Sequence, residues 1–223
     1  MKIDVPLSIP EGVSFPEYGR EDQLRRWIWR QIQIPQPMYL ISTLKPGGVP
    51  NCEANSWGLP FGFAPNQMFA FVCGRAHHTA QNVLREGEFV ANLPGAAIGA
   101  TAVRAARSYA ENEDEIAKSG LTAIPSRVVK PPRIRECFAH LECTLEWFKK
   151  TDSEGGLLLC GRIVAASGDH DAVTGDIQSK IRRTRPILVM PWNIDTERMQ
   201  LTGGPGQTTA FADVGEVRHI QEG

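Results

Sequence analysis

Short apolar runs rich in β-branched and aromatic residues alternate with Gly- and Pro-rich segments from residue 38 to residue 94. Runs of this length and composition predict antiparallel strands joined by tight turns. Two longer runs of the same kind follow after residue 135 and are separated by the turn KKTDSEGG. We therefore expect a mainly β fold. The predicted strands are residues 38–43, 51–58, 68–73, 87–94, 136–148 and 157–167.

Helical periodicity is confined to a few segments. In residues 21–32, Leu24, Trp27, Ile28 and Ile32 recur at the spacing of one helix face. Residues 78–86 predict a second helix, with Thr79 as its N-cap and Gly87 directly after it. The Ala-rich and then acidic residues 95–120 fit two further helices. Residues 201–211, LTGGPGQTTAF, are too rich in Gly for us to expect regular structure there.

The order of these elements suggests three parts. Residues 1–36 form an arm with a short helix, residues 37–204 a single β-rich domain, and residues 205–223 a tail. The first residues contain no apolar leader, and no stretch approaches the roughly 18–20 apolar residues that span a bilayer. We expect a soluble, cytoplasmic protein that does not enter a membrane.

Charge and composition narrow the choice of partner. The 223 residues contain 24 Lys+Arg and 25 Asp+Glu, a formal net charge of −1. A protein that binds nucleic acid by neutralising phosphates usually carries a basic excess, so we expect no nucleic-acid partner. With 42% hydrophobic and 22% charged residues the chain is also not disordered as a whole. A small-molecule or protein partner is favoured.

The five cysteines form no CxxC pair and leave one unmatched, which argues against a secreted disulfide framework. In the expected strand, Cys137 and Cys143 point to one face and His140 to the other, so the three do not converge on one ion. Asp169, His170 and Asp171 are adjacent on a loop and are interpreted as a solvated turn. We expect buried structural thiols and no metal site.

The densest local chemistry lies at the start of the helix at residues 78–86. There Arg75, His78, Thr79 and Asn82 surround free backbone N–H groups, which attract anions. Arginine adds to that preference because its guanidinium matches a phosphate. The alternative is an ordinary helix cap with a surface arginine.

A second candidate is the strand end Ala54-Asn55-Ser56-Trp57. Asn and Ser beside Trp can present donors to the carbonyl edge of a flat heterocycle, although a strand entering a turn has the same composition. No GxSxG motif occurs, and no Ser and His form a recognisable nucleophile pair, so no catalytic residue is assigned. The basic run Lys180, Arg182, Arg183 and Arg185 is either a solvated face or a docking site for a phosphorylated cosubstrate or an acidic protein.

At this point the chain resembles the flavin reductase-like family of FMN-binding split barrels, which includes flavoredoxin. The resemblance extends from about Pro37 to Gly204, and it is carried by an ordered set of short pieces. These pieces are residues 40–43, 51–57, the pair Thr79 and Asn82, and residues 88–94, 119–122, 130–133, 139–143 and 161–165.

The resemblance implies a closed, six-stranded antiparallel split barrel of Greek-key type with peripheral helices. It also implies a homodimer with FMN near the subunit interface. Two residue groups would then bind the cofactor. Arg75, His78, Thr79 and Asn82 would hold the phosphate end, and Ala54, Asn55, Ser56 and Trp57 would line the ring system.

Three functions are compatible with this resemblance. The first is an NAD(P)H-dependent flavin reductase that passes electrons to a second acceptor, with a nicotinamide as cosubstrate. The second is a flavoredoxin-like electron carrier reduced by a protein donor, and the third is a flavin-binding module without turnover. A reductase of this kind needs little acid–base machinery because the flavin accepts the hydride, which agrees with the lack of a catalytic triad.

Overall fold

The computed structural model describes residues 34, 36–107, 109–151, 155–190, 193–195, 200–202 and 208–211. By its contacts the chain divides into two units, one made of residues 37–187 and 211–223, the other of residues 1–36 and 188–210. The predicted helix at residues 21–32 lies outside the described residues.

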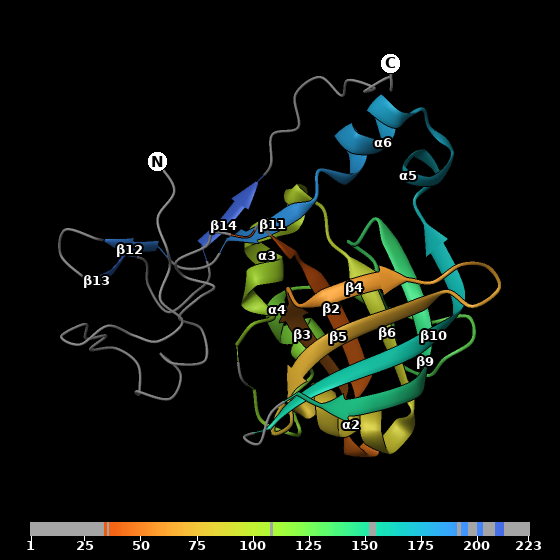
Figure 1. Cartoon of the computed structure of the whole chain (residues 1–223), viewed down its shortest axis with the longest axis vertical. Coiled ribbons are helices and arrows are strands. Elements are labelled where there is room, and N and C mark those ends of the chain that lie inside the picture. Colours follow the sequence, from red (N-terminus) through yellow and green to blue (C-terminus); the bar gives the residue numbers. More distant parts are fainter. Residues whose placement is uncertain are drawn as a thin grey trace. The chain divides into compact units, whose positions relative to one another are not determined.

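A seven-stranded antiparallel sheet forms the larger unit and curls around its interior (Figure 1). The strand order is β3-β2-β6-β9-β10-β5-β4, so chain neighbours such as β5 and β6 are separated in the sheet. The apolar runs in the sequence predicted six of these seven strands. The strands are β2 (Tyr39–Leu44), β3 (Pro50–Asn55), β4 (Gly58–Phe61), β5 (Met68–Gly74), β6 (Glu88–Leu93), β9 (Ala139–Lys150) and β10 (Gly156–Gly168).

The two edges of this sheet meet where β3 passes into β4. Asn55 Nδ2 donates to the Val72 carbonyl at 2.8 Å, and the Val72 N–H donates to the Trp57 carbonyl at 2.9 Å. The mainly β, antiparallel fold is confirmed. The ladder among the described residues has seven strands and two edges, in place of the six-stranded closed barrel expected. The additional strand β4 contains Pro60, which lacks an N–H and therefore suits an edge position.

The interior of the sheet is filled by apolar side chains from five strands and α2 (His78–Glu86). Its aromatic centre joins Tyr39 to Phe69 at 4.9 Å between ring centroids and Phe71 to Phe89 at 5.2 Å, both in edge-to-face contact. Ala80 and Val83 of α2 are fully buried against this cluster. The helix therefore closes one end of the core, and its first residues are fixed relative to β3 and β5.

The α2 boundaries agree with the prediction, and Gly87 ends the helix in the left-handed conformation at φ 71°. The N-cap is His77 and not Thr79. Thr79 is the second residue of α2 and is buried. Asp114 caps α4, where its side chain accepts from Ala117 N–H. The other helices are η1 (Pro46–Gly48), η2 (Ala96–Ile98), α3 (Gly99–Arg104), α4 (Glu115–Ser119), α5 (His170–Thr174) and α6 (Ile177–Thr184).

Short strands complete the described structure, and two of them correct the expectation for residues 201–211. Gln200–Thr202 (β13) pairs antiparallel with Asn193–Asp195 (β12), and Thr208–Phe211 forms β14, although Gly residues lie between them in the sequence. The others are β1 (Gln36–Pro37), β7 (Ala123–Ile124), β8 (Arg133–Ile134) and β11 (Ile187–Met190). Across the described residues, no helix combines the length and apolarity that a bilayer crossing requires.

Candidate functional site

A buried polar network fastens the start of α2 to β2 and β3. Asn51 Nδ2 donates to Thr43 Oγ1 at 3.0 Å and to Thr79 Oγ1 at 2.9 Å, and Asn82 Nδ2 donates to Thr43 Oγ1 at 2.9 Å. All four residues are at most 2% exposed. Thr79 and Asn82 thus have partners inside the protein, and their side chains position the helix.

Arg75 and His78 lie on the outer side of the same helix start. Arg75 is exposed, and its backbone N–H donates to the Gly155 carbonyl at 2.6 Å, which fixes the turn between β5 and α2. His78 is half-buried, with its Nδ1 3.2 Å from Glu115 Oε1. Of the four residues predicted at the helix start, these two are the ones that solvent reaches.

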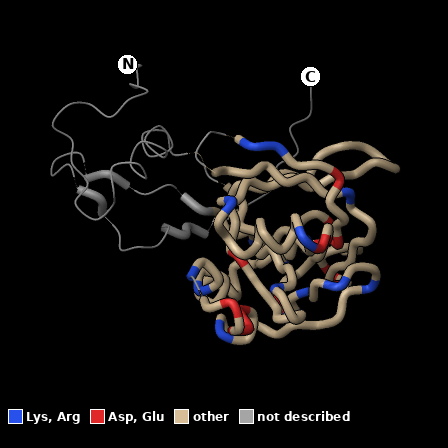
Figure 2. The backbone as a smooth tube through the Cα atoms, turned by 90° about the horizontal axis from the view of Figure 1, so that it is seen from below, with Lys and Arg blue, Asp and Glu red and all other residues tan. Residues whose placement is uncertain are grey.

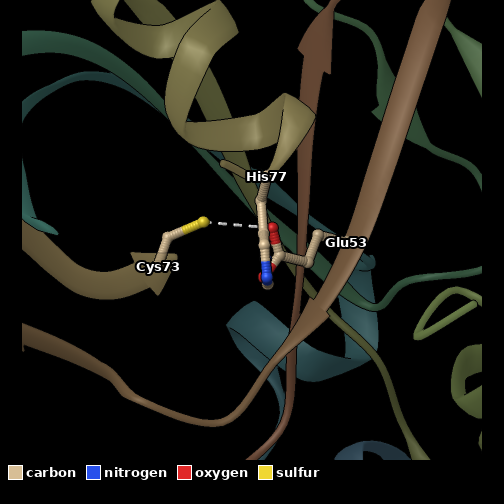
Figure 3. Close-up of side chains that lie close together, drawn as sticks. All are labelled: Glu53, Cys73 and His77. Carbon is tan, nitrogen blue, oxygen red and sulfur yellow. Dashed lines mark hydrogen bonds and ion pairs between the residues drawn. The ribbon is translucent and has the colours of Figure 1, made fainter. Parts of the chain in front are cut away.

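Beside that helix start, three side chains from β3, β5 and the N-cap converge (Figure 3). Cys73 Sγ donates to Glu53 Oε2 at 3.2 Å, and His77 Nδ1 lies 3.2 Å from Glu53 Oε1. Burial by itself raises the pKa of Glu53, but hydrogen bonds with His77, Thr79 and Cys73 and the charge of His77 lower it overall. Burial, followed by the neighbouring Glu53 carboxylate, raises the pKa of the Cys73 thiol. Sequence reasoning missed this cluster because Glu53 is far from Cys73 and His77 along the chain.

A second buried cluster joins Lys45, the residue after β2, to α4 and the start of α2. Lys45 Nζ lies 2.7 Å from Glu115 Oε1 and donates to the carbonyls of Ala110 and Glu113 at 2.8 and 2.9 Å. The Lys45 side chain is completely buried and that of Glu115 is 6% exposed. Because Glu115 also contacts His78, this ion pair holds α4 against the start of α2.

The predicted ring-binding segment occupies the junction between the two sheet edges. The Ala54 N–H donates to the Ala105 carbonyl at 3.1 Å, and the Trp57 N–H donates to Asn55 Oδ1 at 2.8 Å. Asn55 is buried, Ser56 is half-buried, and Trp57 is 44% exposed. Trp57 is therefore the member of this segment that a ligand reaches most directly, and Ala54 and Ser56 are both half-buried.

The two groups of predicted binding residues both lie next to β5. The Trp57 carbonyl accepts a hydrogen bond from the Val72 N–H, and Arg75 follows three positions after Val72, where β5 leads into α2. Trp57 and Arg75 are both exposed, so an aromatic ring and a guanidinium are available to a ligand. These side chains have the chemistry needed to contact the ring system and a phosphate of a flavin.

The other sequence candidates remain structural in the described residues. His140 Nε2 lies 2.9 Å from the Ile134 carbonyl, and its Nδ1 lies 3.2 Å from Ser167 Oγ, away from Cys143 in the core. Asp169 pairs with Arg183 instead of joining His170 and Asp171. All five cysteines are buried free thiols, as expected.

The basic run belongs to α6 and the residue after it. Arg182 donates to Ser179 Oγ at 3.3 Å, and Arg183 forms the ion pair with Asp169 noted above. After α6 the chain reaches Ile187, whose carbonyl accepts from Met38 N–H at 2.9 Å, and Tyr39 pairs with Asn55. The segment after α6 is thus hydrogen-bonded to the start of β2, which pairs with the end of β3, two residues before Trp57. Elsewhere in the larger unit, acidic and basic residues are interspersed along the backbone (Figure 2).

Comparison with known proteins agrees with this architecture. A family model described as the flavin reductase like domain matches residues 30–186. An uncharacterised protein of Bacillus subtilis is 31% identical over 154 residues, which cover 65% of this chain and 75% of the relative.

Two solved structures share the fold. Component B of nitrilotriacetate monooxygenase from Bacillus cereus has a TM-score of 0.71 and 24% identity, covering 98% of this chain and all of that one. Flavoredoxin of Desulfovibrio vulgaris (Miyazaki F) has a TM-score of 0.69 and 22% identity, covering 86% and 93% of the two chains. The chain belongs to the flavin reductase-like family. A flavin-related oxidoreductase role follows from that membership.

Proposed function

We propose that this protein binds FMN and is an NAD(P)H-dependent flavin reductase that passes electrons to a second acceptor. The observation that carries the proposal is that exposed Trp57, whose carbonyl bonds to β5, and exposed Arg75, which follows β5, occur in a fold of the flavin reductase-like family. In this arrangement Arg75 and His78 contact the phosphate. Thr79 and Asn82 hold the helix start in place.

The ring system in this proposal lies at the junction of β3 and β4. Ser56 and Trp57 contact it, while Ala54 and Asn55, whose hydrogen bonds are within the protein, set the path of the backbone. A bound flavin supplies the hydride acceptor, so this chain has to bind and orient the two reactants. The basic side chains of α6 are proposed to attract the phosphates of the nicotinamide cosubstrate.

One absorbance experiment tests the function. Protein loaded with FMN under anaerobic conditions should lose its flavin absorbance within minutes of adding NADH or NADPH. In the variant Lys180→Gln with Arg182→Gln the KM for the nucleotide should rise severalfold, with the absorbance of bound FMN unchanged. This pair leaves the Arg183–Asp169 ion pair intact. If neither nucleotide reduces the bound flavin, the reductase assignment is wrong.

The likeness to flavoredoxin favours a second candidate, an electron carrier reduced by a protein donor. A carrier would show negligible oxidation of either nucleotide. In that case Lys180→Gln with Arg182→Gln would slow electron uptake from an acidic protein donor. The rate of electron uptake by the wild type would fall steeply with added salt. Bound flavin that neither type of donor reduces would identify a flavin-binding module without turnover.

We also propose that the protein is a cytoplasmic homodimer. Edge strand β4 and the turn after it expose Leu59 (62%), Phe61 (40%) and Phe63 (89%), an apolar surface that a second copy would cover. Light scattering at micromolar concentration should give twice the chain mass, and Phe63→Glu should shift the protein toward the monomer. A monomeric wild type would contradict the proposed assembly.

The proposed cytoplasmic location rests on the cysteines. Five unpaired thiols suit a reducing compartment, which cell fractionation would test.

A further inference from the structure

Glu53, Cys73 and His77 offer three different metal-binding atoms at one point of the described structure. Their donor atoms all lie within 4.8 Å of one another, although the residues come from β3, β5 and the N-cap of α2 (Figure 3). We propose that this cluster is a binding site for a divalent zinc ion, with Cys73 Sγ, His77 Nδ1 and one Glu53 oxygen as ligands. The inference does not depend on flavin binding.

The spacing of the donors carries the proposal. Zinc bonds of about 2.3 Å to sulfur and about 2.0 Å to nitrogen or oxygen place tetrahedral ligand atoms roughly 3.3–3.5 Å apart. The measured contacts are close to this length, since Glu53 Oε2 lies 3.2 Å from Cys73 Sγ and Glu53 Oε1 lies 3.2 Å from His77 Nδ1. The two contacts use different oxygens of Glu53, so the three donors, all within 4.8 Å of one another, converge on one ion by rotation of the His77 ring, whose side chain is 58% exposed.

The neighbouring residues fit a site at this position. A Cβ atom at Gly74 would lie 2.8 Å from His77 Nε2, so a larger residue at the end of β5 would displace the ring. Glu53 is held from the other side by its hydrogen bond with Thr79, itself fixed by Asn51 at 2.9 Å. Support of this kind by residues around the ligands is typical of metal sites.

The donor chemistry selects the type of metal. One thiolate with one imidazole and one carboxylate suits zinc, whereas magnesium and calcium prefer oxygen donors alone. A divalent ion is neutralised by Cys73 thiolate and Glu53 carboxylate, so the complex has no net charge at a half-buried position. Binding displaces the thiol proton of Cys73 to solvent, and no oxidant or reductant is required. The exposed His77 side leaves the fourth position to water.

Titration of the full-length, EDTA-treated and desalted protein with zinc and with cobalt tests this site. We expect one ion per chain, and for cobalt a near-ultraviolet thiolate charge-transfer band. Cys73→Ser should remove that band. His77→Gln should weaken zinc binding by more than the roughly 10- to 100-fold typical of residues that only orient ligands.

Two further variants separate the site from general effects. His170→Gln is the matched control, because His170 Nδ1 also lies 3.2 Å from a carboxylate, that of Asp171, but has no cysteine in the cluster. It should bind zinc like the wild type. Gly74→Ala keeps all three ligands and should weaken binding about tenfold by displacing the His77 ring. Absence of saturable binding in folded wild-type protein, or wild-type zinc affinity in both Cys73→Ser and His77→Gln, would overturn the proposal.

Discussion

Replacing Lys45 by Met is expected to destabilise the fold by about 3–5 kcal/mol, the usual cost of leaving one member of a buried ion pair alone. The Lys45 ammonium is completely buried and binds the Glu115 carboxylate at 2.7 Å. Its loss leaves that carboxylate in the interior with His78 and the Cys52 N–H as its remaining partners. Urea unfolding followed by circular dichroism measures the change.

The same region offers a matched control. Lys118 pairs with Glu113 at 2.9 Å, but its side chain is 56% exposed, and water replaces such a contact. Lys118→Met should therefore leave the unfolding midpoint unchanged. Adding Glu115→Gln to Lys45→Met should recover part of the lost stability, because the buried charge is then removed. Equal effects of the two lysine substitutions would contradict the buried-pair interpretation.

Arg75→Ala is expected to weaken FMN binding by about 10- to 100-fold. A charge-assisted hydrogen bond contributes about 1.5–3 kcal/mol, and about 1.4 kcal/mol corresponds to a tenfold change in affinity. Arg75 is exposed at the turn before α2, so the substitution should leave the fold intact. Fluorescence titration with FMN and with riboflavin measures the effect.

Riboflavin provides the internal comparison because it lacks the phosphate. Wild-type protein should bind riboflavin much more weakly than FMN, and Arg75→Ala should change riboflavin affinity little. Arg135→Ala, which removes an exposed arginine from the turn before β9, should bind both ligands like the wild type. Equal affinity of the wild type for FMN and riboflavin would show that no phosphate contact exists at Arg75.

Local sequence determined the elements around the site. The apolar and β-branched runs that predicted β2, β5, β9 and β10 depend on the residues within each strand and on the turns beside them. Gly87 ended α2 as predicted, since the left-handed conformation after a helix favours glycine. Strand β4 was missed because Pro60, with Gly58 at the start of the strand and Gly62 directly after it, makes that segment resemble a turn.

The tertiary structure alone decided which polar side chains come together. Lysine and glutamate are normally exposed residues, and Lys45 and Glu142 are buried only because distant segments supply their partners. Lys45 meets Glu115 across 70 positions, and Glu142 accepts backbone N–H groups of Arg127, Val128 and Val129. Likewise, Thr79 was predicted as the N-cap of α2, but its hydroxyl accepts a buried hydrogen bond from Asn51. Packing of the helices and loops against the sheet, which a local pattern does not specify, set each of these contacts. It also brought Glu53 of β3 to Cys73 of β5 and to His77, although β3 and β5 are not neighbours in the sheet.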